Sequence, residues 1–286
     1  MRDIRNRMRS VRQSLQVTGA MKLISTAKLR KARLRLDETR PYFEAIRDTM
    51  HDIIVHAEAS GERWFDKRPD KRERKACTLV ITADKGLAGG YNHAVIRFAE
   101  EACPPGSILL PIGQVGKRYF LEKDYVILED FAVSRKEPTV YEAKDVASFA
   151  VDQFLSGRID EFRVVFTRMH STVKLEPEMI GLLPLDKEPI LAKSRHELDS
   201  EMYSYEPSED AVFDVLVPQY LKGIIYGALV EAFASEQAAR MTAMDSASKN
   251  AEEMLGHLQL VYNRARQAAI TSEVSEIVAG AAALQD

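Results

Sequence analysis

The sequence contains few residues of the kinds on which most binding sites depend. Of its 286 residues only two are cysteines, Cys77 and Cys103, and they form no C-x-x-C pair. We therefore expect two free, buried thiols rather than a disulfide or a metal pair. The six histidines, at positions 51, 56, 93, 170, 196 and 257, show no H-E-x-x-H pattern or other ligand spacing. The sequence thus predicts no metal site and no cofactor.

Long apolar runs are also missing. None approaches the roughly 20 residues that a membrane span needs, and the basic start of the chain, residues 1–5, lacks the apolar stretch of a secretory signal. The composition, 45% apolar and 29% charged, is typical of a folded soluble protein. We expect neither insertion into a membrane nor secretion.

Phosphate-binding motifs are absent too, since neither G-x-x-x-x-G-K-[ST] nor G-x-G-x-x-G occurs. The Gly-rich loop at residues 84–92 does follow an expected strand and precede an expected helix, where backbone N–H groups can bind anions. A structural turn is favoured here, with Asp84 and Lys85 as a local cap and ion pair. A phosphate-binding α/β enzyme that uses this loop stays open as an alternative, although no catalytic residue can be assigned.

What the sequence does have is helical periodicity at both ends. Apolar or small residues from Ile4 to Thr18 recur in alternating steps of four and three, and helix formers extend this helix to about residue 36. Pro41 is expected to bend or interrupt it before a further helical stretch, residues 45–57. From residue 211 to 284 only Pro218 breaks the helical pattern. A seam with the same spacing runs from Met244 through Ala268 to Ser272.

The two helical ends carry opposite charge. Residues 1–40 hold 12 Lys/Arg against 3 Asp/Glu, whereas residues 206–286 hold 5 Lys/Arg against 12 Asp/Glu. The helix beyond Pro218 would have about 65 residues and a length of about 100 Å. A compact domain formed by a chain of 286 residues cannot bury a helix of that length. We therefore expect the two ends to pack as an antiparallel coiled coil.

Between the ends, short β-rich runs alternate with helical ones. The candidate strands are residues 77–82, 107–112, 125–128 and 163–168, and the candidate helices are residues 92–102, 114–121 and 141–155. This alternation predicts an inserted Rossmann-like α/β domain, while residues 173–192 carry no readable pattern. The predicted fold class is α+β: a shaft helix at 1–58, an α/β domain at 76–192, and a second shaft helix at 211–286 that pairs with the first.

Four blocks of the sequence match the motifs of a known family. Residues 270–281, ITSEVSEIVAGA, resemble the C-terminal signature of γ subunits of bacterial F-type ATP synthases. Similar blocks are VTGAMK at 17–22, ITADKGLAGGYN at 81–92 and SEQAARMTAM at 235–244, and their order and spacing hold along the chain. The cysteine-bearing insert of chloroplast γ subunits is absent, and we expect no organellar transit segment.

The resemblance implies a non-catalytic rotor without a cofactor. The terminal helices would form a shaft inside a ring of three α and three β subunits, and the globular part would lie near the ε subunit and the membrane c-ring. Flow of protons or sodium ions would turn the shaft and so drive ATP synthesis. The implied location is the cytoplasmic side of the cell membrane, as a peripheral part of the complex, with no nucleic-acid partner.

The resemblance also implies contact residues. Those at the α/β ring, or bracing the shaft beneath it, are Met21, Lys22, Arg240, Gln267, Thr271 and Glu273, and those of the foot near ε and the c-ring are Tyr203, Tyr205 and Glu206. The simpler interpretation is that all are ordinary seam and surface residues. The chain departs from the family at Gly19 and Gly227, where longer polar or basic residues are common. Gly19 would either soften the helix or permit close packing of a neighbour.

A third class of function rests on the basic start of the chain. Its arginines, at positions 2, 5, 7, 9 and 12, could bind nucleic acid, with an affinity that falls steeply with salt. Interleaved aromatic residues are missing from this segment, and the acidic C-terminal helix is available as a partner in the same chain. A basic coiled-coil nucleic-acid binder therefore stays open as the second alternative.

Overall fold

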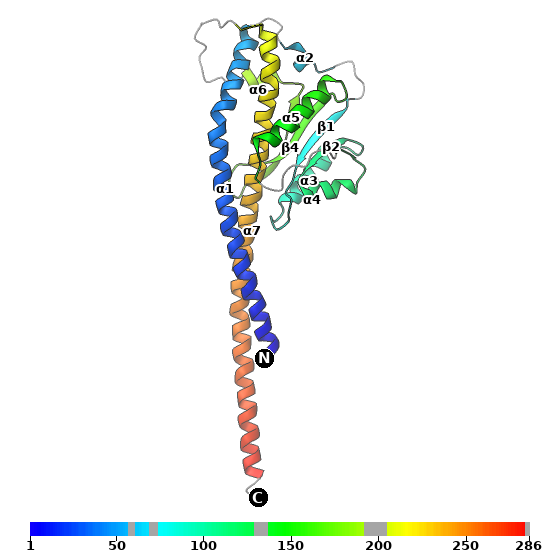
Figure 1. Ribbon diagram of the computed structural model, residues 1–286. Coiled ribbons are helices and arrows are strands. Elements are labelled where there is room, and N and C mark those ends of the chain that lie inside the picture. The colour runs from blue at the N-terminus through cyan, green and yellow to red at the C-terminus, as the bar shows by residue number, and fades with distance from the viewer. Residues whose placement is uncertain (57–60, 69–73, 129–136, 192–204, 284–286) are drawn as a thin grey trace. The chain divides into compact units, whose positions relative to one another are not determined.

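Two long helices and a five-stranded sheet make up the fold (Figure 1). The structure, a computed structural model, describes residues 1–56, 61–68, 74–128, 137–191 and 205–283. The contacts divide the chain into two compact units, which are described separately. Unit 1 comprises residues 1–25 and 240–286, and unit 2 comprises residues 26–239.

Helices α1 (Arg2–His56) and α7 (Glu209–Ala283) contribute to both units and contain a proline each. Of the two outcomes expected at Pro41, a bend or an interruption, the interruption was wrong, as was the expected break at Pro218, because both helices continue through these residues. A proline inside a helix costs about 3 kcal/mol through a lost hydrogen bond and a steric clash. Ile46, close to Pro41 in α1, and Leu221, close to Pro218 in α7, are buried in the same core cluster. They hold these parts of the two helices in the core of unit 2. This packing offsets the local cost.

The sheet of unit 2 has the strand order β3-β2-β1-β4-β5. Its strands are β1 (Ala76–Ile81), β2 (Ile108–Ile112), β3 (Val126–Ile127), β4 (Glu161–Met169) and β5 (Leu175–Leu183). The first four are parallel to one another, as the Rossmann-like prediction requires, and β5 pairs antiparallel with β4. Strand β5 lies in the stretch that carried no readable pattern. It is a half-buried edge strand interrupted by Pro177 and Gly181, so its sequence lacks regular alternation.

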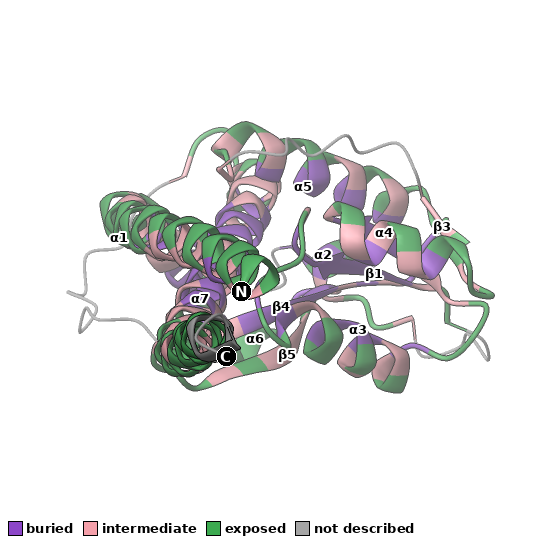
Figure 2. Ribbon diagram, turned by 90° about the horizontal axis from the view of Figure 1, so that it is seen from below, coloured by how far each residue is buried: buried purple, intermediate pink, exposed green. Residues whose placement is uncertain are grey.

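Helices cover both faces of this sheet. Helices α3 (Tyr91–Ala102) and α4 (Gln114–Leu121) contribute buried residues to one apolar cluster, and α5 (Val140–Leu155) and α7 contribute to the other. Figure 2 shows the buried sides of α3 and α5 turned toward the strands. Two short helices, α2 (Glu62–Phe65) and α6 (Lys187–Leu191), complete unit 2. The mixed sheet with long terminal helices confirms the predicted fold class.

One stretch within Glu209–Val278 of α7 is long and apolar enough to cross a membrane by length and composition alone. The expectation that no such run exists was therefore too strict. Of that stretch, 44% is buried inside the protein, and a buried core helix passes the same test. Leu229 and Val230 of α7 belong to the core against the sheet, which accounts for the apolar character of this part of the helix.

The two cysteines are free and buried, as expected. Burial, assisted by the neighbouring Cys103, raises the pKa of the Cys77 thiol to about 12. The thiol therefore stays protonated and unreactive at neutral pH.

Candidate partner-binding surface

Unit 1 is an antiparallel pair formed by the start of α1 and the later part of α7. Arg5 Nη2 donates a hydrogen bond of 2.9 Å to Tyr262 Oη, and the Arg5 guanidinium lies 5.7 Å from the centroid of that ring. Further along α1, the hydroxyls of Thr18 and Ser248 are 2.8 Å apart. Residues early in α1 thus meet residues late in α7, which confirms the expected pairing in this unit.

Lys22 takes part in this pairing. Its Nζ donates a hydrogen bond of 2.6 Å to Asp245 Oδ1, and Lys249 Nζ lies 3.0 Å from the other carboxylate oxygen. The hydrogen bonds from Lys22 and then Lys249 hold the pKa of Asp245 below its usual value. Met21 is half-buried, and Arg240 is only 9% exposed. Lys22 therefore joins the two helices, and Arg240 is a buried residue of α7.

Helix α7 continues beyond the start of α1. Because Arg5 already contacts Tyr262 and α1 begins at Arg2, the pairing ends only a few residues after Tyr262. The seam expected to continue through Ala268 and Ser272 was wrong in this stretch, since both residues are exposed. The reason is that the partner helix is too short to reach them. Three predicted contact residues, Gln267, Thr271 and Glu273, lie on this unpaired stretch and are exposed.

The unpaired stretch also presents an apolar stripe. Its members, Ile270, Val274, Ile277 and Val278, are 52%, 54%, 65% and 62% exposed. Their spacing places them on one side of the helix, and contiguous exposed apolar residues mark interaction surfaces. Sequence reasoning missed the stripe because it followed the seam to Ala268 and Ser272 on another side of the helix. The spacing of the four residues in the sequence was the available signal.

The predicted foot residues fall in unit 2 or outside the description. Tyr203 lies outside the described residues. Tyr205 is half-buried, and its hydroxyl donates a hydrogen bond to Asp52 Oδ2 near the end of α1. Glu206 is exposed. The structure thus holds Tyr205 against α1 and leaves the neighbouring carboxylate facing solvent.

The Gly-rich loop at residues 84–92 lies at the carboxyl ends of β1 and β2, where open α/β sheets bind ligands. Asp84 Oδ1 accepts a hydrogen bond of 3.1 Å from the backbone N–H of Gln114, the first residue of α4. A carboxylate thus occupies the position that a bound anion would take. Asp84 thus caps a helix distant in the sequence, whereas the prediction was a local cap, and its ion pair with Lys85 stays a prediction.

Helix α7 covers the same crevice. Tyr91 Oη donates a hydrogen bond of 3.1 Å to the backbone carbonyl of Ala232 in α7. The cavity that is left between the loop and α7 measures about 60 Å³, far below the roughly 300 Å³ of small-molecule sites. This geometry does not favour a phosphate-binding enzyme.

Gly19 lies in the paired part of α1, two residues before Met21. A methyl group added there would meet no atom within 4 Å, so packing inside this chain does not require glycine. We expect Gly19→Ala to raise the free energy of unfolding by about 0.5–1 kcal/mol, because alanine favours the helix. Urea unfolding followed by far-UV circular dichroism measures the change. Gly256→Ala, at an equally open position of α7, should give a similar gain, and a loss of stability at Gly19 would contradict the expectation.

Comparison with known proteins gives consistent matches along the whole chain. The chain matches the family described as ATP synthase over residues 1–284. It is 44% identical over 290 residues to the ATP synthase gamma chain of Ruminiclostridium cellulolyticum, covering 100% of this chain and 99% of that protein. It is 36% identical over 298 residues to the ATP synthase gamma chain, sodium ion specific, of Acetobacterium woodii, covering 99% and 98%.

Solved structures show a similar fold. A chain in the OSCP/F1/c-ring structure of the Euglena gracilis mitochondrial ATP synthase, in rotational state 3, superposes with a TM-score of 0.65 at 19% identity. The match covers 99% of this chain and 94% of that chain. A rotor chain of the same organism's enzyme in state 1 gives a TM-score of 0.61 at 19% identity, covering 94% and 98%. These matches support neither the phosphate-binding enzyme nor the nucleic-acid binder.

Proposed function

Because the chain belongs to the ATP synthase γ-chain family, we propose that it is the central rotor subunit of an F-type ATP synthase and catalyses no reaction itself. The shaft comprises the two terminal segments, residues 1–58 and 211–286, and the α/β domain comprises residues 76–192. The partners are the α and β subunits, the ε subunit and the c-ring. Through them the chain lies at the cytoplasmic side of the cell membrane.

The unpaired end of α7 is the observation that carries this proposal. Its stripe of four exposed apolar residues, defined above from Ile270 to Val278, has no covering partner among the described residues of unit 1. A lone helix with such a stripe is stabilised when a partner surrounds it. A ring of α and β subunits provides such an enclosure, whereas an isolated enzyme or a nucleic-acid site does not.

The contact residues divide into three groups. Gln267, Thr271 and Glu273 are exposed on the unpaired end and meet the surrounding ring directly. Lys22 and Arg240, with Met21, brace the paired part of the shaft below it. Tyr205 and Glu206, with Tyr203, form the foot near ε and the c-ring. This division explains why Gln267 is exposed and Arg240 is buried, although both were predicted together as residues that contact the ring or brace the shaft.

Rotation acts by biasing the conformation of the β subunits. A site that switches between 1:99 and 99:1 populations needs about 5.5 kcal/mol of differential contact energy. The shaft can supply it because its surface is asymmetric: basic on α1, and exposed and apolar along one side of the end of α7. Each β site therefore meets a different surface as the shaft turns.

The test is reconstitution of the full chain with α, β and ε subunits and the membrane sector. We expect the double substitution Val274→Glu/Ile277→Glu to reduce coupled ATP synthesis at least tenfold, because charges replace the apolar stripe. Val173→Glu, at an 83% exposed apolar residue of unit 2, is the matched control and should leave synthesis unchanged. Equal activity of the double variant and the control would refute the proposal, as would micromolar ATP binding or ATP hydrolysis by the isolated chain.

A further inference from the structure

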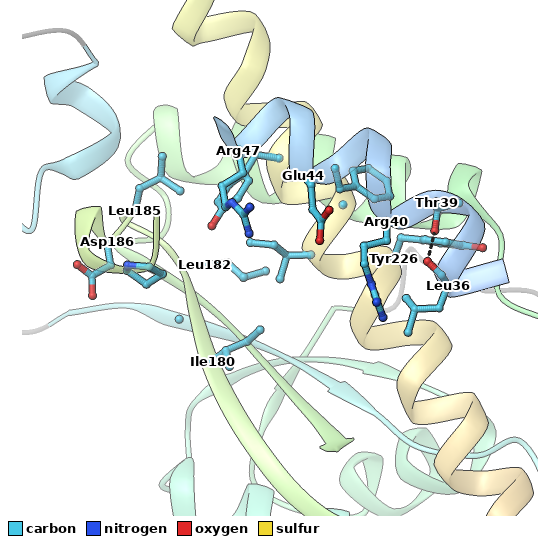
Figure 3. A pocket seen from close by; sticks show the side chains of 17 residues that line it. Leu36, Thr39, Arg40, Glu44, Arg47, Ile180, Leu182, Leu185, Asp186 and Tyr226 are labelled. Carbon is cyan, nitrogen blue, oxygen red and sulfur yellow. Dashed lines mark hydrogen bonds between the residues drawn. The ribbon is translucent and has the colours of Figure 1, made fainter. Parts of the chain in front are cut away.

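Unit 2 contains a pocket of about 520 Å³ between α1, β5 and α7 (Figure 3). Its volume lies within the roughly 300–1,000 Å³ typical of small-molecule sites. Most of its lining is apolar: Leu36, Phe43, Ile180, Leu182, Leu185 and Ile224. All of its lining residues belong to unit 2, whereas the apolar stripe on which the rotor proposal rests belongs to unit 1.

Three glycines line the pocket, and two of them leave open space. Gly223 and Gly227 follow one another by one turn on α7, and Gly181 lies on β5. The Phe43 ring fills the position above Gly223, since a Cβ there would lie 2.3 Å from a ring carbon. No atom lies within 4 Å of the Cβ positions at Gly227 and Gly181. The pocket is thus open at Gly227, one helical turn beyond Gly223, where the Phe43 ring fills the space.

The rim of the pocket is formed by polar residues of α1. Arg40, Glu44 and Arg47 are spaced so that they share one side of the helix, and Figure 3 shows their side chains extending toward the β5 residues. Arg47 is largely buried, with 16% of its side chain exposed, and its Nε and Nη2 donate to Asp48 Oδ1.

Both guanidinium groups keep donors for a ligand. A guanidinium carries five N–H donors, and Arg47 uses only Nε and Nη2 in contacts with described residues. Arg40 contacts Asp37 at 3.2 Å through Nη2 alone. Among the four charged residues of the lining, Glu44 lies between the arginines, and Asp186 lies at the other end of the pocket from Arg40 (Figure 3). The four charges of the lining balance, so what distinguishes the rim is the N–H donors that Arg40 and Arg47 leave unused, and not a net positive charge.

We propose that this pocket binds a small amphipathic molecule with an apolar body and one anionic group. The apolar body lies along Leu182 and Ile224 in the space above Gly227, and the anionic group accepts hydrogen bonds from Arg40 and Arg47. Carboxylates pair well with guanidinium groups because the geometries match. The bound molecule contacts α1, β5 and α7 together and so joins the long helices of unit 2 to its sheet.

The test uses the full-length chain and two probes of equal chain length and opposite charge. Isothermal titration calorimetry below the micelle concentration should show saturable binding of one dodecanoate per chain. Dodecyltrimethylammonium should bind at least tenfold more weakly, because its head group cannot accept hydrogen bonds from the two arginines. Equal affinity for the two probes, or no saturable binding of dodecanoate, would overturn the proposal.

A substitution that fills the pocket locates the binding. Gly227→Leu should weaken dodecanoate binding at least tenfold, since the new side chain enters the empty space. Gly256→Leu, the same change at an exposed and open position of α7 outside the pocket, should bind as the parent does. If Gly227→Leu lowers the melting temperature, Gly181→Val fills the pocket from β5 instead. Unchanged affinity in a folded filling variant would place the ligand elsewhere and refute the assignment.

The charged rim is tested separately. Arg40→Gln removes a cation whose only described partner is the exposed Asp37, so the fold should be preserved. Dodecanoate affinity should fall about fivefold, and that of dodecyltrimethylammonium should not fall. A loss that is equal for both probes would mean that Arg40 shapes the pocket without selecting an anion, which contradicts the proposal.

Discussion

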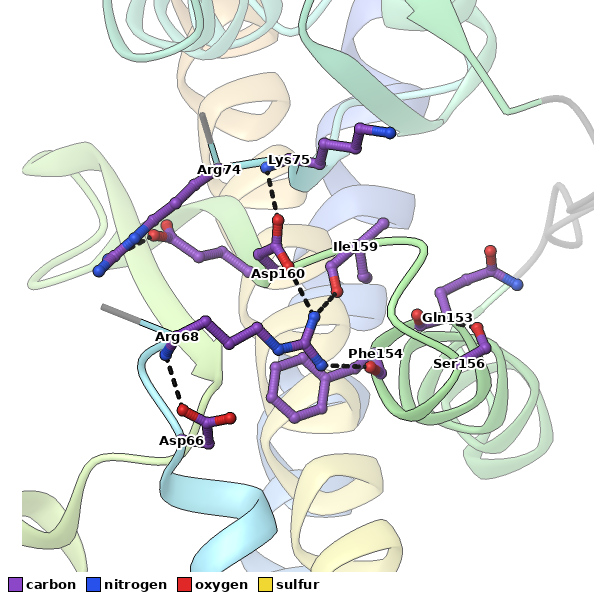
Figure 4. Close-up of polar contacts among 10 residues, drawn as sticks. Asp66, Arg68, Arg74, Lys75, Gln153, Phe154, Ser156, Ile159 and Asp160 are labelled. Atoms are coloured by element: carbon purple, nitrogen blue, oxygen red, sulfur yellow. Dashed lines mark hydrogen bonds and ion pairs between the residues drawn. The ribbon is translucent and has the colours of Figure 1, made fainter. Parts of the chain in front are cut away.

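Replacing Arg68 by alanine should lower the free energy of unfolding by about 3–5 kcal/mol, because it removes an ion pair with a buried carboxylate and hydrogen bonds to two backbone carbonyls. Arg68 Nη1 lies 2.6 Å from Asp160 Oδ1, and Asp160 is only 3% exposed (Figure 4). The same guanidinium donates to the backbone carbonyls of Ile159 and Phe154 at 2.7 and 2.6 Å. It thus connects the segment before β1 to the turn between α5 and β4.

The measurement is urea unfolding followed by the fluorescence of Trp64. This is the only tryptophan in the sequence, and it is buried in unit 2 with its indole N–H donating to Asp214. Arg158→Ala is the matched control. Arg158 lies in the same turn and is exposed, and among the described residues its side chain donates a hydrogen bond only to Ser156, so its loss should change stability by less than about 0.5 kcal/mol.

Arg68→Lys distinguishes charge from geometry. Lysine keeps the positive charge but cannot reproduce the fork that reaches Asp160 and two carbonyls. We expect Arg68→Lys to lie between the parent and Arg68→Ala. If Arg68→Ala were as stable as the Arg158→Ala control, the contacts of Arg68 with Asp160 and the two carbonyls would contribute nothing measurable. The role assigned to Arg68 would then be wrong.

Gly223→Ala should make the chain less stable than Gly227→Ala by about 1–3 kcal/mol, although both replace a glycine of α7 one turn apart. The added methyl at Gly223 would lie 2.3 Å from the Phe43 ring, whereas at Gly227 it meets nothing within 4 Å. Both changes gain about 0.8–1 kcal/mol of helix propensity. The difference between the variants therefore isolates the clash between α1 and α7.

Thermal unfolding of Gly223→Ala and Gly227→Ala, monitored by the fluorescence of Trp64, gives the two melting temperatures to be compared. Phe43→Leu in the Gly223→Ala background should recover part of the lost stability, because the smaller side chain makes room for the methyl group. Equal melting temperatures for Gly223→Ala and Gly227→Ala would show that the ring moves aside without cost. The close approach of α1 and α7 at this point would then be incidental.

Some elements could be predicted from the sequence because their signals are local. The three–four spacing of apolar residues specified α1 and α7, and four short β-rich runs specified β1 to β4, since side chains buried on one side recur with the period of the backbone. Strand β5 could not be predicted in this way. It is an edge strand whose pairing with β4 depends on a partner and not on its own pattern.

The candidate contact residues show the same limit. Gln267, Thr271 and Glu273 were assigned from the resemblance to a family, and the sequence alone could not say that they are exposed. Their exposure depends on where α1 begins relative to α7, which the contact between Arg5 and Tyr262 establishes. Lys22 was selected by the same reasoning, but its ion pair with Asp245 depends on the register of the two helices.

The sequence by itself determined that both ends of the chain are long helices of opposite charge and that an α/β domain lies between them. These properties follow from periodicity and composition, which each segment carries alone. Only the tertiary structure decided that α1 and α7 continue through Pro41 and Pro218, because packing of distant residues offsets the local cost of proline. It also decided that α7 closes the crevice beside Asp84 and that glycines leave a pocket at Gly227. Both depend on which surfaces meet in space, and no local pattern encodes that.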